Sequence, residues 1–170
     1  MIILIFELRT LTYTHNYYIY LLIREPLVRR MSEKEIHKFI EEWTWGTIVA
    51  VNGNKPYAIE VTYTSDGKNL YFGSRPGGKM AQCIKANPNI AFKICNSDKN
   101  FSKWKAVIVE GIAERLTKRD DLYYSVNLFI KRYNFSKEFF YDMAERMSAN
   151  PDLSSLLRLP IENLSGVCSP

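Results

Sequence analysis

Residues 47–73 have the sequence TIVAVNGNKPYAIEVTYTSDGKNLYFG, and this stretch decides the fold. Over residues 57–63, apolar side chains alternate with small or polar ones, which is the period of a strand with two different faces. Short Asn/Gly and Asp/Gly segments separate the apolar runs and are typical of tight hairpin turns. The stretch therefore predicts an antiparallel meander of three strands, at 47–51, 57–63 and 69–73, with turns at 52–54 and 65–68.

The apolar spacing outside the meander predicts further helices and strands. Residues 32–43 have the spacing of an amphipathic helix, and Ser32 followed by Glu35 matches a capping box. Gly111 suggests a bulge or a close backbone approach within a long strand. The other predicted elements are helices at 79–86, 120–133 and 136–148 and strands at 90–95, 104–116 and 156–161, the last one in the chain. This order favours a closed antiparallel barrel with helices packed outside, because closure removes exposed sheet edges.

The composition is that of a single globular domain. The chain has 170 residues, 46% hydrophobic and 24% charged, so it can bury one sizeable core and is not a disordered protein. Its net charge of +5 is spread without a run of like charges, which argues against a nucleic-acid-binding arm. The cysteines and histidines lack the spacing of a zinc site or a disulfide framework. We therefore expect a reducing, cytoplasmic location.

Residues 1–30 differ in composition from the rest of the chain. Their longest uncharged stretch, Thr10–Ile23, has 14 positions, whereas a membrane-spanning helix needs about 20 apolar residues. A secretory signal pattern is also missing. We interpret residues 1–30 as an extension that is either disordered or a start-site artefact, with a peripheral anchor as a further alternative. The folded domain is expected to comprise residues 31–170.

The segment that carries chemistry begins where the third strand ends. Residues 71–79 have the sequence YFGSRPGGK, in which a strand enters a loop with two adjacent glycines and a lysine opens the next helix. Such a loop leaves backbone N–H groups free to face an anion, and Ser74, Arg75 and Lys79 add a hydroxyl and two positive charges. The segment matches neither a Walker A loop nor G-x-G-x-x-G. Its chemistry predicts a phosphate site, with an ordinary strand-to-helix turn bearing solvated cations as the alternative.

Several short motifs follow one another over residues 46–116. They are TIVAV at 47–51, Lys55-Pro56-Tyr57, Leu70-Tyr71-Phe72, Gly77-Gly78-Lys79-Met80, Ile84 before Asn87-Pro88-Asn89-Ile90, and VIVEGIA at 107–113. In this order and spacing they resemble the FMN-binding split-barrel proteins of the pyridoxamine 5′-phosphate oxidase-like superfamily. Residues 157–161 resemble that family's closing strand. The resemblance implies a mainly β (α+β) fold: an antiparallel split β-barrel of Greek-key type with flanking helices.

The resemblance also implies a set of cofactor-binding residues. Family members bind the flavin in a groove at a dimer interface, so a homodimer with two equivalent sites is expected. Lys79 corresponds to the phosphate-binding lysine of the family. Residues 59–64 correspond to the strand that lies beside the isoalloxazine ring. The complete set carried over is Ile59, Glu60, Val61, Thr62, Tyr63, Thr64, Phe72, Gly73, Ser74, Arg75, Gly77, Gly78, Lys79, Trp104, Lys105 and Ala106.

The resemblance implies an FMN-dependent oxidoreductase with a small-molecule electron donor or acceptor. The alternatives are a deazaflavin (F420) reductase on the same barrel, a non-catalytic flavin-binding or stress-response module, and a structural barrel without cofactor. We expect no catalytic side chain, because the flavin itself exchanges hydride or electrons. At the positions of Ile59, Gly78 and Ala106 in this chain, the true oxidase of the family has an arginine, another cation and a glutamine. Oxidation of vitamin B6 is therefore not expected. The resemblance is closer to the general-stress and nitroimidazole-resistance branches.

Some residues near the predicted site have simpler interpretations. The Glu60 carboxylate is expected to be solvated rather than to tune a flavin. Trp43 and Trp45 are expected to pack in the core rather than to stack on a ring. Cys83 and Cys95 are interpreted as small buried hydrophobic residues.

Overall fold

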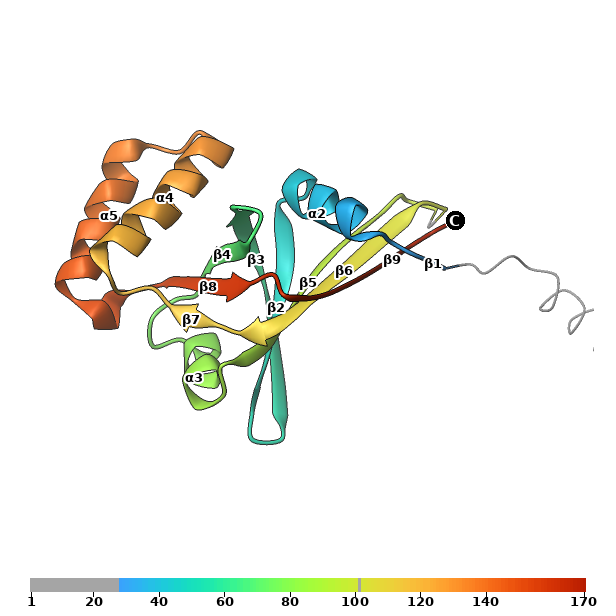
Figure 1. The fold of residues 1–170 in the computed structure, drawn as a ribbon. Coiled ribbons are helices and arrows are strands. Elements are labelled where there is room, and N and C mark those ends of the chain that lie inside the picture. Colours follow the sequence, from blue (N-terminus) through green and yellow to red (C-terminus); the bar gives the residue numbers. More distant parts are fainter. Residues whose placement is uncertain (1–27, 101) are drawn as a thin grey trace, which may run out of the picture.

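The computed structural model describes residues 28–100 and 102–170 of the chain. Within these ranges the chain forms one curled sheet flanked by helices (Figure 1). The helices are α2 (Glu33–Glu42), α3 (Lys79–Ala86), α4 (Arg119–Tyr133) and α5 (Lys137–Ala149), followed by the 3-10 turn η1 (Pro151–Leu153). The strands are β1 (Arg29–Arg30), β2 (Trp45–Asn52), β3 (Lys55–Ser65), β4 (Asn69–Gly73), β5 (Asn89–Ser97), β6 (Trp104–Ile112), β7 (Glu114–Arg115), β8 (Leu156–Pro160) and β9 (Asn163–Cys168).

The sheet closes on itself through the long strand that was predicted at 104–116. Neighbouring strands follow the order β1-β9-β6-β5-β2-β3-β4-β8-β7. Only Ala113 separates β6 from β7. One extended stretch therefore pairs with β5 along the whole of β6 and with β8 along β7. At Gly111 a side chain approaches closely rather than the predicted backbone, because a Cβ there would lie 3.1 Å from Leu159 Cδ1 and 3.8 Å from Pro160 O. The predicted mainly β split barrel with flanking helices is confirmed.

The capping box predicted at the start of α2 is present. The Ser32 hydroxyl accepts a hydrogen bond from Glu35 N, and the Glu35 carboxylate accepts one from Ser32 N at 2.8 Å. Arg29 Nη2 lies 2.9 Å from Glu35 Oε1. The hydrogen bond from Arg29, followed by those from Ser32, lowers the pKa of Glu35 to about 2. Glu35 thereby connects β1 to the first turn of α2.

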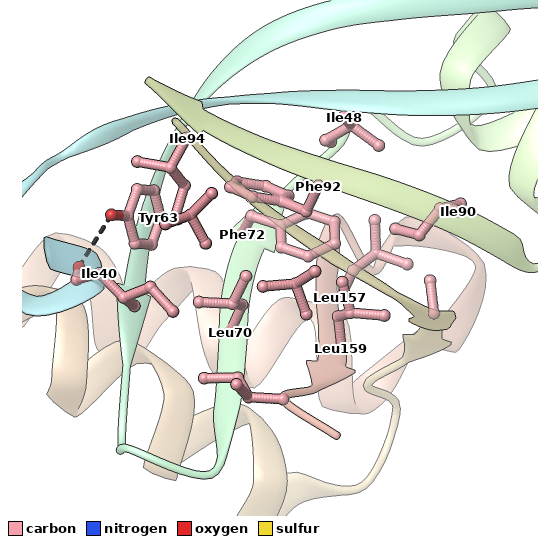
Figure 2. Packing of buried hydrophobic residues seen from close by; sticks show 14 of the residues in the cluster. Ile40, Ile48, Tyr63, Leu70, Phe72, Ile90, Phe92, Ile94, Leu157 and Leu159 are labelled. Atoms are coloured by element: carbon pink, nitrogen blue, oxygen red, sulfur yellow. Dashed lines mark hydrogen bonds between the residues drawn. The ribbon is translucent and has the colours of Figure 1, made fainter. Parts of the chain in front are cut away.

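Aromatic rings pack among aliphatic side chains in the barrel interior (Figure 2). The ring centroids of Phe72 and Phe92 are 5.0 Å apart, and those of Tyr63 and Phe92 are 5.3 Å apart. The buried Tyr63 hydroxyl donates to Ile40 O at 2.8 Å, which joins α2 to the barrel. Burial raises the pKa of Tyr63 above its ordinary value, so this hydroxyl stays a donor at neutral pH.

A second apolar cluster lies beneath the helix pair α4–α5, which covers β4 and β8 at one end of the barrel. Tyr71 contributes its ring to this cluster, and its hydroxyl donates to Asp66 Oδ2 at 2.9 Å. Residues of the two clusters therefore come from opposite faces of β4: Leu70 and Phe72 on the barrel side and Tyr71 on the helix side.

Some expectations from the sequence are wrong. The strand at 156–161 is not the last one, because β9 follows it and pairs with β6. Trp45 is not a core residue: it takes an outward position on β2 and is 53% exposed, whereas Trp43 packs against the core as expected. Cys95 is exposed on the outward face of β5, whereas Cys83 is buried.

Residues 1–27, most of the predicted extension, lie outside the described residues. Arg29 and Arg30, from the same segment, form β1 and pair with β9. The boundary at residue 31 stays a prediction. In the part of the chain that is described, each helix falls short of the length and hydropathy that membrane crossing requires.

Candidate functional site

The loop between β4 and α3 has the strand–turn–helix form that its glycines predict. Ser74 N donates to Ser155 O at 2.8 Å. This hydrogen bond fixes the start of the loop against the residue that precedes β8. Gly78 N donates to Arg75 O at 3.1 Å and closes a tight turn. Gly77 has a φ of +71°, which favours glycine. A Cβ at Gly78 would already lie 3.1 Å from Arg75 O. The backbone conformation therefore favours glycine at position 77, and a side chain at position 78 would have to displace Arg75 O slightly.

The Ser74 hydroxyl is a buried polar group without a partner. The residue is 4% exposed, and its Oγ has no hydrogen-bond partner among the described residues. A buried hydroxyl normally forms a hydrogen bond, and leaving one unsatisfied costs about 1–3 kcal/mol. The Ser74 hydroxyl at the start of this Gly-rich loop is therefore a donor that has no acceptor among the described residues.

The N-terminus of α3 has no cap from a side chain. Gly78 is the N-cap residue, and the first turn contains no acidic residue. The first helical hydrogen bond joins Gln82 N to Gly78 O, so the N–H groups of the first turn lack intrahelical acceptors. Together with the helix dipole they favour a negative charge at this end of α3.

Two cations flank this helix end. Arg75 and Lys79 are exposed, and among the described residues neither forms an ion pair with a carboxylate. Lys79 Nζ lies 4.4 Å from the ring centroid of Tyr57 on β3. This cation–π contact holds the ammonium group beside the strand without neutralising it.

These groups have the chemistry of a phosphate site. An unsatisfied hydroxyl, free backbone N–H groups and two unpaired cations surround one loop, and each is a donor to an anionic oxygen. The phosphate of a flavin mononucleotide fits this donor set. The alternative predicted from the sequence is an ordinary strand-to-helix turn with solvated cations. That alternative does not explain why the buried Ser74 hydroxyl lacks a hydrogen-bond partner.

The strand predicted to lie beside the isoalloxazine ring divides its side chains between two faces. Ile59, Val61 and Tyr63 pack into the barrel core. Glu60 is exposed, as expected, and accepts a hydrogen bond from Thr47 Oγ1 on the neighbouring strand. Thr62 has the same alternation as Glu60 and lies on the outer face. Thr64 follows the same alternation but is only 2% exposed. The side chains of Glu60 and Thr62 and the backbone of this strand are therefore the parts accessible to a ligand on that face.

Four other predicted site residues do not present their side chains at the loop. The ring of Phe72 is fully buried in the core. Trp104, Lys105 and Ala106 begin β6, which β5 and β2 separate from β3. Lys105 Nζ lies 5.5 Å from the Phe39 ring centroid on α2. A single chain therefore does not bring 104–106 to the loop at 74–79.

Glu60 and Ala106 nevertheless share one face of the sheet, here called the outer sheet face. Thr47 pairs with Glu60 of β3 and with Lys93 of β5, and Lys93 pairs with Ile108 of β6. Ala106 precedes Ile108 by two residues and so points the same way. Three large apolar side chains on this face are exposed: Trp45 (53%), Ile108 (38%) and Ile112 (62%). An exposed apolar group of this kind is typical of an interface.

Sequence reasoning missed the role of Tyr57. The residue stands in the Lys-Pro-Tyr motif, but only the packing of α3 against β3 shows that its ring contacts Lys79. The described residues also contain no group of three or more His, Cys, Asp or Glu side chains placed to hold a metal ion.

Comparisons with solved structures agree with the fold. A FAD-binding protein from Mesorhizobium loti is 23% identical, with 85% of this chain and 99% of that chain covered and a TM-score of 0.61. A putative 5-nitroimidazole antibiotic resistance protein from Bacteroides thetaiotaomicron is 14% identical, with 83% and 87% covered and a TM-score of 0.70. A FAD-binding protein from Mycobacterium smegmatis is 16% identical, with 82% and 97% covered and a TM-score of 0.60. Because the sequence identities are this low, the similarity between these structures and the chain shows a shared fold alone.

Sequence comparison gives the family. An uncharacterized protein from Rhizobium meliloti is 29% identical over 89 residues, a match that spans 52% of this chain and 58% of the relative. The family model of pyridoxamine 5′-phosphate oxidase matches residues 32–167, which include β2 to β8 and the whole loop at 74–79. The chain belongs to the pyridoxamine 5′-phosphate oxidase family.

Proposed function

We propose that the chain binds FMN, with the flavin phosphate at the loop 74–79, and acts as an FMN-dependent oxidoreductase. The observation that carries the proposal is that the loop 74–79 begins with the unsatisfied Ser74 hydroxyl and ends at the uncapped N-terminus of α3. The flavin-binding proteins among the solved structures of the same fold support it.

Each part of the loop has a defined role in this proposal. The Ser74 hydroxyl, the Gly77 N–H and the N–H groups in the first turn of α3 donate to the phosphate oxygens. Arg75 and Lys79 neutralise the charge of these oxygens. Tyr57 keeps the Lys79 ammonium group in place through its ring. The backbone of 59–64 orients the ring system along β3. When bound, the flavin supplies hydride or electron transfer to or from a small-molecule partner.

A homodimer completes the site in this proposal. Within one chain, β2 and β5 separate Trp104–Ala106 from the strand at 59–64. Two copies that pack through the outer sheet face would bury Trp45, Ile108 and Ile112 and would place 104–106 of one copy over β3 of the other. The exposure of those three apolar side chains supports this arrangement.

The unpaired state of the cysteines agrees with a reducing compartment such as the cytoplasm. Cys83, Cys95 and Cys168 are all free thiols, and unpaired cysteines are the rule in reducing compartments.

The absorption spectrum of the purified chain, before and after addition of excess FMN, tests the proposal. We expect a flavin spectrum, and FMN as the released chromophore after denaturation. A deazaflavin spectrum would show that the bound cofactor is F420 rather than FMN. A chain that stays colourless and takes up neither cofactor would contradict the proposal.

Reoxidation separates an enzyme from a binding module. The bound flavin is reduced under anaerobic conditions and then mixed with quinones or nitro compounds. An oxidoreductase reoxidises with at least one acceptor faster than free reduced FMN at the same concentration. A reduced flavin that is inert in the protein would favour the non-catalytic flavin-binding module.

A further inference from the structure

One carboxylate, that of Glu60, sets the charge on the part of the outer sheet face where the flavin ring is proposed to lie. Side chains alternate between the two faces along β2 and β3. The outward residues that pair across these strands are Trp45, Thr47, Val49 and Val51 on β2 and Thr62, Glu60, Ala58 and Pro56 on β3. All of them except Glu60 are uncharged, and Glu60 is exposed.

In the part of the chain that is described, no cation neutralises the Glu60 carboxylate. It forms no ion pair there, and it accepts a hydrogen bond from Thr47 Oγ1 at 2.5 Å. Lys93 is on the same face, but it pairs with Thr47, so β2 lies between Lys93 and Glu60. Thr47 therefore orients the carboxylate and leaves its charge intact.

The proposed dimer would also leave this charge in place. Residues 104–106 of the second copy would cover β3, and Lys105 is the cation of that stretch. Its Nζ lies 5.5 Å from the Phe39 ring centroid on α2, so the side chain points to the opposite face from Ala106. The ring of Trp45, which pairs with Thr62, adds an apolar wall. A charge acts more strongly in such a covered, apolar place than on an open surface.

We propose that Glu60 makes the ring site select against negative charge, so that the electron acceptor is an uncharged or cationic molecule rather than a carboxylate or a phosphate ester. The inference rests on the proposed function, because it concerns the same ring site. A quinone belongs to this class: it takes two electrons and two protons from the reduced flavin and leaves as the hydroquinone, while the flavin returns to its oxidised form. The same carboxylate disfavours the reduced flavin when the ring carries a negative charge, whereas the oxidised ring is uncharged.

Two quinones that differ in one sulfonate group test the selection. The full chain with bound, reduced FMN is mixed anaerobically with 1,4-naphthoquinone or with its 2-sulfonate, and each rate constant is divided by that of free reduced FMN. We expect the corrected rate constant to be at least about fivefold higher for the uncharged quinone, because like charges repel. Glu60→Gln keeps the shape and an acceptor for Thr47, and it should speed the sulfonate reaction about fivefold and the other less than twofold. Glu138→Gln, an exposed change on α5 away from this face, should alter neither rate constant.

The affinities of the two redox forms of FMN give a readout that does not depend on turnover. The dissociation constants of oxidised and reduced FMN are measured for the unchanged chain and for Glu60→Gln. The variant should bind reduced FMN about fivefold more tightly relative to oxidised FMN, because the like charge beside the reduced ring is gone. The midpoint potential of the bound flavin should become more positive for the same reason.

The outcomes separate this inference from the proposed function. If FMN binds and Glu60→Gln leaves the ratio of the two quinone reactions unchanged, the inference is overturned and the proposed function stands. If the reduced flavin reacts with neither quinone, the affinities decide, and an unchanged ratio of oxidised to reduced FMN affinity overturns the inference. If the chain binds no flavin, both proposals fail together. Circular dichroism of each variant shows that an altered reaction is not a loss of folding.

Discussion

The Lys79 ammonium group lies 4.4 Å from the centre of the Tyr57 ring. The two residues come from different elements, α3 and β3, so the contact fixes the lysine relative to the strand proposed to carry the flavin. A lysine held by a ring keeps its full charge, whereas one held by a carboxylate would not attract a phosphate. The contact thus positions a cation without cancelling it.

Replacing the ring of Tyr57 should weaken FMN binding. A cation–π contact at a partly exposed site contributes about 0.5–1 kcal/mol, so Tyr57→Leu should raise the FMN dissociation constant about two- to fivefold. Tyr57→Phe keeps the ring and should stay within twofold of the unchanged chain. Quenching of flavin fluorescence measures both. Equal effects of the two substitutions would show that the ring does not act through Lys79.

Ser74→Ala should have opposite effects on stability and on binding. Removing a buried hydroxyl without a partner relieves its desolvation cost, so the free energy of unfolding of the flavin-free chain should rise by about 1 kcal/mol. The same change removes a donor to the phosphate and should lower FMN affinity about two- to tenfold. Urea unfolding and FMN titration are the measurements. A loss of stability would mean that the hydroxyl already has a partner in the flavin-free chain.

A charge on the outer sheet face should separate the proposed dimer. Ile112 is 62% exposed on this face, and Ile112→Glu would bury a carboxylate against a second copy. Sedimentation should give twice the chain mass of 19.8 kDa for the unchanged protein and the single mass for the variant. Phe139→Glu is the matched control, since Phe139 is 59% exposed on α5, away from that face. A dimer that survives Ile112→Glu would place the interface elsewhere.

Acid should weaken the junction of β1 and α2 through Glu35. Its pKa in the folded chain is lowered from 4.5 to about 2 by Arg29 and Ser32. A lowered pKa contributes stability above the unfolded value, and that contribution is lost as the pH falls from about 4.5 to about 2. The stability difference between the unchanged chain and Glu35→Gln should therefore be largest near pH 6 and should shrink toward pH 2. Urea unfolding at several pH values measures it, and a pH-independent difference would contradict the assignment.

The alternation of apolar and polar residues in the sequence predicted most strands of the barrel. The meander at 47–73 and the helix starting at Ser32 depend on local signals, namely period, turn residues and a capping box, and they were predicted correctly. β9 was missed because its sequence, NLSGVC, has few strand-forming side chains. Gly166 in that strand is explained by packing, since a Cβ there would lie 2.7 Å from Ile36 Cγ1. Local sequence contains no signal for such a contact.

The sequence predicts the loop of the candidate site, but not which side chains around it are buried or exposed. The glycines and Lys79 are visible in the sequence, and the strand–turn–helix form follows from them. The burial of the Ser74 hydroxyl depends on the approach of Ser155, which is distant in the chain. The outward position of Trp45 depends on the register of β2, and one residue of slip would have buried it.

The affinity of FMN compared with that of riboflavin tests most directly whether the loop binds the flavin phosphate. The two ligands differ only in the phosphate, and a charge-assisted hydrogen bond contributes about 1.5–3 kcal/mol. We predict that the unchanged chain binds FMN at least about tenfold more tightly than riboflavin, and that Lys79→Ala removes most of this difference. Lys34→Ala, an exposed change on α2, should leave the difference intact. Equal affinities for FMN and riboflavin in the unchanged chain, or a difference that Lys79→Ala leaves intact, would contradict a phosphate site at residues 74–79.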